Sequence, residues 1–73
     1  MARILDRVTA MHPTTGKTIS LTREYDHEYL EYSVRVRING KRIPERDYFA
    51  GDSAIDAELT QAAMLNEFYS KGV

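Results

Sequence analysis

Strict alternation of apolar and polar residues marks the centre of the chain. From Tyr29 to Ile38, every second residue after Tyr32 is apolar, and the residues between are serine or arginine. A period of two with β-branched and aromatic residues indicates a half-buried strand. Asn39-Gly40 follows directly and accepts the positive φ angles of a type I′ turn. We therefore predict a β-hairpin whose return strand, Lys41-Arg42-Ile43, is limited by Pro44.

Two more strands are predicted upstream of the hairpin. Lys17 to Tyr25 also alternates, with Ile19 and Leu21 on one face and serine or threonine on the other. His12 to Gly16 is rich in turn-forming residues, so the first segment, Arg3 to Met11, is most simply a strand paired with the second. The apolar residues of that first segment also fit one face of a helix, and the sequence leaves both interpretations open.

The hydrophobic period changes in the last third of the chain, where apolar residues recur at helical spacing. Gly51-Asp52-Ser53 precedes the change, and Ser53 is a natural N-cap with Asp56 three residues further on. Lys71-Gly72 supplies a favourable C-terminal charge and a stop. We predict a helix from about Ala54 to Ser70.

This helix is expected to dock on the sheet through its most apolar side. The predicted core packs Ile55, Leu59, Ala62, Leu65 and Tyr69 against Ile19, Leu21, Val34, Val36 and Ile38. On a helical wheel, Ala57, Met64 and Phe68 then fall on or near the opposite side, and Phe68 can wrap toward the edge of the core. Met64 is therefore predicted to lie exposed and to centre a second interface, either with a second copy of the chain or with a partner. The simpler interpretation is a single exposed apolar residue.

These elements predict an α+β fold: a small antiparallel sheet of three to four strands with one C-terminal amphipathic helix packed on one face. A chain of 73 residues allows one domain, residues 1–73, with a small core. The N-terminus lacks the apolar stretch of a signal peptide, no segment is long enough to span a bilayer, and cysteine is absent. We therefore expect a soluble, cytoplasmic protein.

Catalytic and metal chemistry have little support in the sequence. Asp26-His27-Glu28 is the densest group of potential metal ligands, but neighbours in an extended chain point to opposite sides. A site combining His12 with the other histidine stays open. The chain has no cysteine, no Gly-x-Ser-x-Gly nucleophile and no glycine-rich phosphate loop. We expect a protein that is not an enzyme and needs no cofactor or metal.

Charge is unevenly distributed along the chain. Ser33 to Arg46 carries five basic residues and one acidic residue, whereas Asp47 to Val73 carries five acidic residues and one basic residue. The hairpin should therefore present a basic sheet face on the side away from the helix. Tyrosine and arginine dominate interface energetics, and the predicted partner-binding residues are Arg35, Arg37, Lys41, Arg42, Tyr29 and Met64. The alternative is a solvated face that only aids solubility.

The hairpin and the helix after it resemble the second half of a double-stranded RNA-binding domain. The similarity covers Tyr32 to Lys41 and the helix that follows within twenty residues, about half of the chain. That family places a lysine cluster at the start of its last helix, where this chain has Ser53-Ala54-Ile55-Asp56. Because an acidic residue replaces the phosphate-binding lysines, the resemblance implies the topology and not RNA binding.

A second resemblance is to small proteins of bacteriophages and prophages, including the type I-F anti-CRISPR class. It rests on Asn39-Gly40-Lys41, on Arg46-Asp47-Tyr48-Phe49 and on the acid-rich helix that follows. This resemblance implies a non-catalytic protein that binds a host defence complex. The expected function is therefore a protein-binding module, monomeric or homodimeric, that inhibits a host protein complex such as a CRISPR effector. The alternative is an accessory protein that binds nucleic acid through the basic hairpin.

Overall fold

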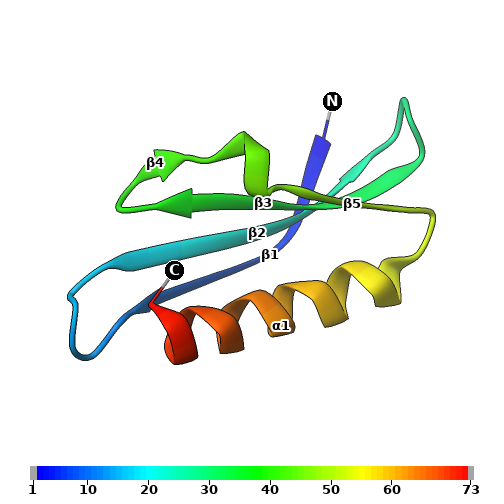
Figure 1. The fold of residues 1–73 in the computed structure, drawn as a ribbon. Helices are drawn as coiled ribbons and strands as arrows, with labels where there is room; N and C mark the ends of the chain where they lie inside the picture. The colour runs from blue at the N-terminus through cyan, green and yellow to red at the C-terminus, as the bar shows by residue number, and fades with distance from the viewer. Residues whose placement is uncertain (1, 73) are drawn as a thin grey trace.

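The protein is a two-layer structure in which one long helix lies beneath an antiparallel sheet (Figure 1). A computed structural model describes residues 2–72. The elements are β1 (Ala2–Met11), β2 (Thr18–Asp26), β3 (Glu31–Ile38), β4 (Lys41–Arg42), the 3-10 helix η1 (Pro44–Arg46), β5 (Tyr48–Gly51) and α1 (Ala54–Lys71). The predicted α+β fold, with a small antiparallel sheet and a single C-terminal helix, is confirmed.

Three long strands form the body of the sheet in the order β1-β2-β3, and β3 then pairs with two short strands. Of these, β4 pairs with the end of β3 at Arg37 and Ile38, and β5 pairs with its first half, where Val34 lies opposite Tyr48. The strand interpretation of the first segment is correct, and the helical one is wrong. The short β5 strand was not predicted, because Tyr48-Phe49-Ala50 is too brief to show a period.

Local sequence signals position the turn and the helix as predicted. Asn39 and Gly40 have φ angles of 51° and 80°, which a type I′ turn requires. At the start of α1, the Ser53 hydroxyl accepts a hydrogen bond from the Asp56 amide at 3.1 Å. Gly72 ends the helix in the left-handed conformation, and its amide donates to the Phe68 carbonyl.

The core confirms the sheet side of the prediction. Ile19, Leu21, Val34 and Val36 are all at most 1% exposed, and Ile38 is partly buried beside them. Alternate residues on neighbouring antiparallel strands share a face, and the register places Leu21 beside Val36. The sheet therefore offers the helix one continuous apolar surface.

The helix docks through the face opposite to the predicted one. Ala57 and Phe68 are fully buried, Met64 and Leu65 pack against the core, and Ile55 and Leu59 are 67% and 65% exposed. Tyr69 and Ala62 are exposed as well. Only Leu65 of the predicted docking residues contributes to the core, so the predicted docking face and the exposed position of Met64 are both wrong.

The polar residue Gln61 explains why apolar spacing did not identify the docking face. Gln61 lies at the centre of the buried face, and its side-chain amide donates to the Leu21 carbonyl at 3.0 Å while its oxygen accepts from the Arg23 guanidinium at 3.3 Å. A buried amide with both partners satisfied is acceptable in a core. The small Ala57 one turn earlier leaves room for the backbone of α1 near the sheet.

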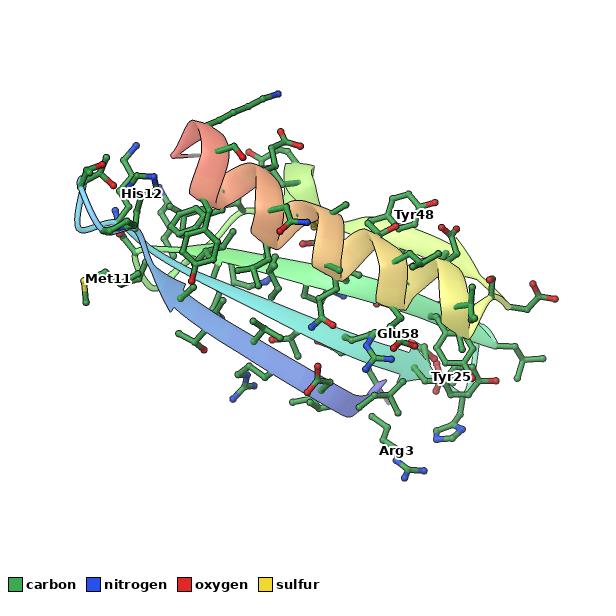
Figure 2. The ribbon with its side chains drawn as sticks, turned by 90° about the horizontal axis from the view of Figure 1, so that it is seen from below. Arg3, Met11, His12, Tyr25, Tyr48 and Glu58 are labelled. Atoms are coloured by element: carbon green, nitrogen blue, oxygen red, sulfur yellow. The ribbon has the colours of Figure 1, made fainter. Side chains whose placement is uncertain are left out.

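His12 fixes the C-terminal end of α1 against the turn between β1 and β2. Its Nε2 lies 3.2 Å from the Tyr69 carbonyl, its Nδ1 accepts from the amide of Thr14, and its ring packs edge-on against Phe68. Figure 2 shows His12 at the end of the sheet where the helix stops. His27 follows β2 at the other end, so the two histidines do not form a shared metal site.

No helix within residues 2–72 has the length and apolar character needed to cross a membrane.

Candidate protein-binding face

The sheet surface away from α1 carries the predicted basic residues. We call it the open face and define it by three rows of residues paired across the strands: Ile4, Glu24, Ser33 and Phe49; Arg7, Thr22 and Arg35; and Thr9, Ser20, Arg37 and Arg42. Figure 1 shows that the helix lies on the other side of the sheet. The open face therefore mixes apolar, polar and charged side chains, and two of its three rows each contain two arginines.

Asp47 holds two of these arginines, Arg35 and Arg42, in place. It follows η1, its side chain is only 2% exposed, and its carboxylate accepts two hydrogen bonds from Arg42, at 3.0 and 2.7 Å. Arg35 donates to the same carboxylate at 3.1 Å, and the backbone amide of Val36 donates at 3.0 Å. A buried carboxylate with four donors is a fixed anchor for both guanidinium groups.

The ionisation of this cluster follows from the same contacts. Burial alone would raise the pKa of Asp47, but the donors from Arg42, Val36 and Arg35 outweigh it, so the pKa lies below its usual range. The Asp47 carboxylate in turn raises the pKa of Arg42, against the opposing effect of burial. The cluster is therefore ionised throughout the physiological range of pH.

Arg35 also covers an exposed aromatic ring. Its guanidinium carbon lies 5.0 Å from the centre of the Phe49 ring, and Phe49 is 51% exposed. A cation held over a ring is favourable by about 0.5–1 kcal/mol at an exposed site. Because Asp47 already holds Arg35, the Arg35–Phe49 pair presents a preorganised aromatic and cationic surface to solvent.

The first strand adds a basic residue that the sequence analysis did not select. Arg7 is exposed, faces the same side as Arg35 across Thr22, and donates to the Thr22 hydroxyl at 3.4 Å. The strand alternation already assigns Arg7 to this face once β1 is taken as a strand. Phe49 and Asp47 had no such signal, because their positions depend on β5 and on the 3-10 turn before it.

The structure brings together three of the six predicted partner-binding residues. Arg35, Arg37 and Arg42 share the open face, where Arg37 is exposed and donates to the Gly40 carbonyl at 3.2 Å. Lys41 pairs with Ile38, which places it on the other face of the sheet. Tyr29 is 75% exposed in the turn between β2 and β3, at the far end of the sheet. Met64 packs against the core, away from the open face.

Asp26-His27-Glu28 forms the start of that far turn. Asp26 accepts hydrogen bonds from the amides of Glu28 and Tyr29, at 2.8 and 3.3 Å. These donors lower the pKa of Asp26, against the opposing effect of its desolvation. The Asp26 carboxylate therefore stabilises the turn. Across residues 2–72, no three histidine, aspartate or glutamate side chains gather where they could hold a metal ion.

Comparison with known proteins returns no relative. No protein-family model matches the chain, and searches of curated proteins and of solved structures find no match. The geometry of the open face and the sequence resemblances are therefore the basis for a functional proposal.

Proposed function

We propose that this chain is a non-catalytic protein-binding module that engages a host protein complex through its open face. The observation that carries the proposal is the Arg35–Phe49 pair, in which a buried carboxylate holds an arginine over an exposed aromatic ring. Arginine and aromatic residues are enriched at the energetic centres of protein interfaces, and rigid side chains lose less entropy on binding.

The charges around this pair indicate the chemistry of the partner. Arg7 is exposed in the same row as Arg35, and Arg37 is exposed in the next row. They would face acidic side chains, which steer association and fix the register of the complex. The resemblance to small phage proteins suggests a biological role, namely inhibition of a host defence complex in the cytoplasm of the host.

Charge reversal on the open face tests the proposal. We expect Arg37→Glu to reduce capture of a specific protein from nuclease-treated bacterial lysate at least tenfold, without changing the melting temperature. Arg3→Glu is the matched control, because Arg3 is exposed but pairs with Tyr25 on the helix side of the sheet (Figure 2). Equal capture by wild type, Arg37→Glu and a Phe49→Ala variant would contradict the proposal.

Nucleic-acid binding is the competing function, and one observation favours it: exposed Arg7 and Arg37 share the open face with the exposed ring of Phe49, and single-strand binders combine cationic and aromatic side chains in this way. The ion pairs of Arg35 and Arg42 with Asp47 argue against it, because phosphates would have to compete with a buried carboxylate. A fluorescence titration with single-stranded and duplex DNA at several salt concentrations separates the two. Affinity that falls steeply with salt would support nucleic acid.

A further inference from the structure

The outer face of α1 is exposed to solvent, although it carries large apolar side chains. Ile55, Leu59 and Tyr69 are 67%, 65% and 48% exposed, and Ala62 lies exposed between them. A helix that packs on a sheet should be polar on its outer side. We infer that this face binds a second copy of the chain, with the two α1 helices antiparallel, and this dimer goes beyond the proposed function because it uses no open-face residue.

The exposed residues form one continuous seam along α1, in which Asn66 is the polar member. Residues 55, 59, 62, 66 and 69 are separated by four, three, four and three positions, which is the 3.5-residue period of paired helices. The buried side repeats the pattern at 57, 61, 64 and 68. The helix therefore carries two seams on opposite sides, one occupied by the sheet and the other open to a second helix.

The middle of the outer seam allows two backbones to approach closely. Ala62 and Ala63 lie halfway along α1, both exposed, and the larger Ile55 and Tyr69 lie toward the two ends. In an antiparallel pair centred on the alanines, Ile55 of each copy lies near Tyr69 of the other. The contact is then self-complementary, as a twofold interface requires.

Charge selects the antiparallel arrangement over the parallel one. The molecule is elongated, with extents of 40 × 21 × 19 Å. The turn between β2 and β3 and the start of α1 share one end, where Asp26, Glu31, Asp52, Asp56 and Glu58 outnumber the basic Arg3 of β1. The other end, with the turns after β1 and β3 and the end of α1, carries Lys17, Arg37, Lys41 and Lys71 against the single acidic Glu67. Antiparallel helices place each basic end beside an acidic end, whereas parallel helices place like charges together.

Sedimentation of the full chain over a concentration series tests the dimer. Wild type should reach twice the 8.4 kDa mass of the chain as concentration rises, and Leu59→Glu should stay at 8.4 kDa with unchanged circular dichroism. Leu30→Glu is the matched control: Leu30 is 64% exposed, almost the same as Leu59, but lies in the turn between β2 and β3, and it should dimerise like wild type. A monomeric wild type at all concentrations, or a dimer that survives Leu59→Glu, would overturn the inference.

The antiparallel orientation of the two helices can be tested separately with introduced cysteines, because the chain itself contains no cysteine. Ile55→Cys alone and Tyr69→Cys alone should not cross-link with a short bifunctional maleimide, because identical positions lie about 21 Å apart for 14 residues of helix rise. An equal mixture of the two variants should cross-link. Strong self-cross-linking of Ile55→Cys would mean parallel helices and would overturn the antiparallel arrangement. If variants that no longer dimerise still capture the partner protein, the proposed function is unaffected.

Discussion

Asp47 is a buried charged residue whose carboxylate accepts four hydrogen bonds. Its carboxylate joins β3, through the Val36 amide, to Arg42 of β4 and to Arg35 above Phe49. Exposed ion pairs contribute little to stability, as for Lys71 and Glu67, which lie 3.9 Å apart and are mostly solvated. The Asp47 cluster differs because water cannot replace the carboxylate's partners.

Replacing Asp47 with asparagine should therefore destabilise the fold. The asparagine side chain keeps the shape but loses the charge that two guanidinium groups share, and hydrogen bonds to charged groups contribute about 1.5–3 kcal/mol. Urea denaturation at pH 7 measures the difference. Glu67→Gln, which affects only the exposed pair, should change the unfolding free energy by less than about 0.5 kcal/mol. Equal midpoints for all three proteins would show that the cluster is not structural.

The same carboxylate predicts how stability depends on pH. An unfolded aspartate binds its proton near pH 3.9, whereas folded Asp47 has a lowered pKa and resists protonation. Its contribution to stability is therefore complete above about pH 5 and is lost as the pH falls through the folded pKa. Between pH 5 and pH 2, wild type should lose more stability than Asp47→Asn. Parallel stability curves for the two proteins would contradict the cluster's role in acid unfolding.

At the scale of the elements, the orientation of α1 determines which surface the molecule presents on the helix side of the sheet. The inward row of Ala57, Gln61 and Phe68 fixes which apolar residues are left outside. Because Gln61 bonds to both Leu21 and Arg23, rotating α1 would leave the amide or its partners unsatisfied. The exposed seam is thus a consequence of polar contacts in the core.

Two alanine substitutions distinguish the buried face from the outer one. Phe68→Ala should cost about 3–5 kcal/mol and abolish the cooperative thermal transition of so small a domain. Leu59→Ala should leave the melting temperature of the dilute monomer almost unchanged, because its side chain is 65% exposed. Circular dichroism melts at low protein concentration make the comparison. If Leu59→Ala destabilised the protein more than Phe68→Ala, α1 would instead dock through the face that the apolar spacing predicted.

The sequence predicts the strands and turns well because their signals are local. The alternation around Val34 and Val36, the Asn39-Gly40 turn and the Ser53 cap all act within a few residues. The docking face of α1 is not local. Both sides of the helix are apolar, and the choice between them depends on hydrogen bonds of Gln61 to a strand forty residues away. Hydrophobic spacing alone selects the wrong side.

In the candidate site, too, the sequence predicts what depends on local signals and misses what depends on distant contacts. Strand alternation alone is enough to place Arg35 and Arg37 on the open face. It could not show that Arg35 is tied to Asp47 or that Phe49 lies beneath it, because both depend on the short β5 strand and the 3-10 turn. Lys41 lies on the other face because it pairs with Ile38 directly across the two-residue turn.

For the whole molecule, the proposed partner surface and the proposed dimer surface lie on opposite sides of the sheet (Figure 1). The open face would bind the partner protein, and the outer seam of α1 on the other side of the sheet would bind a second copy. An antiparallel dimer leaves both open faces exposed, so each dimer could hold two partner molecules, or two sites on one complex, with increased avidity.

Site-specific photo-cross-linking tests this account most directly. A photoreactive phenylalanine analogue replaces Phe49 in one variant and Tyr69 in another, and both are irradiated in nuclease-treated bacterial lysate. We predict that the analogue at position 49 attaches to a protein other than this chain, whereas the analogue at position 69 yields an adduct of twice the chain mass. If position 49 yields no protein adduct, or position 49 cross-links to nucleic acid when nuclease is omitted, the open face is not a protein-binding surface.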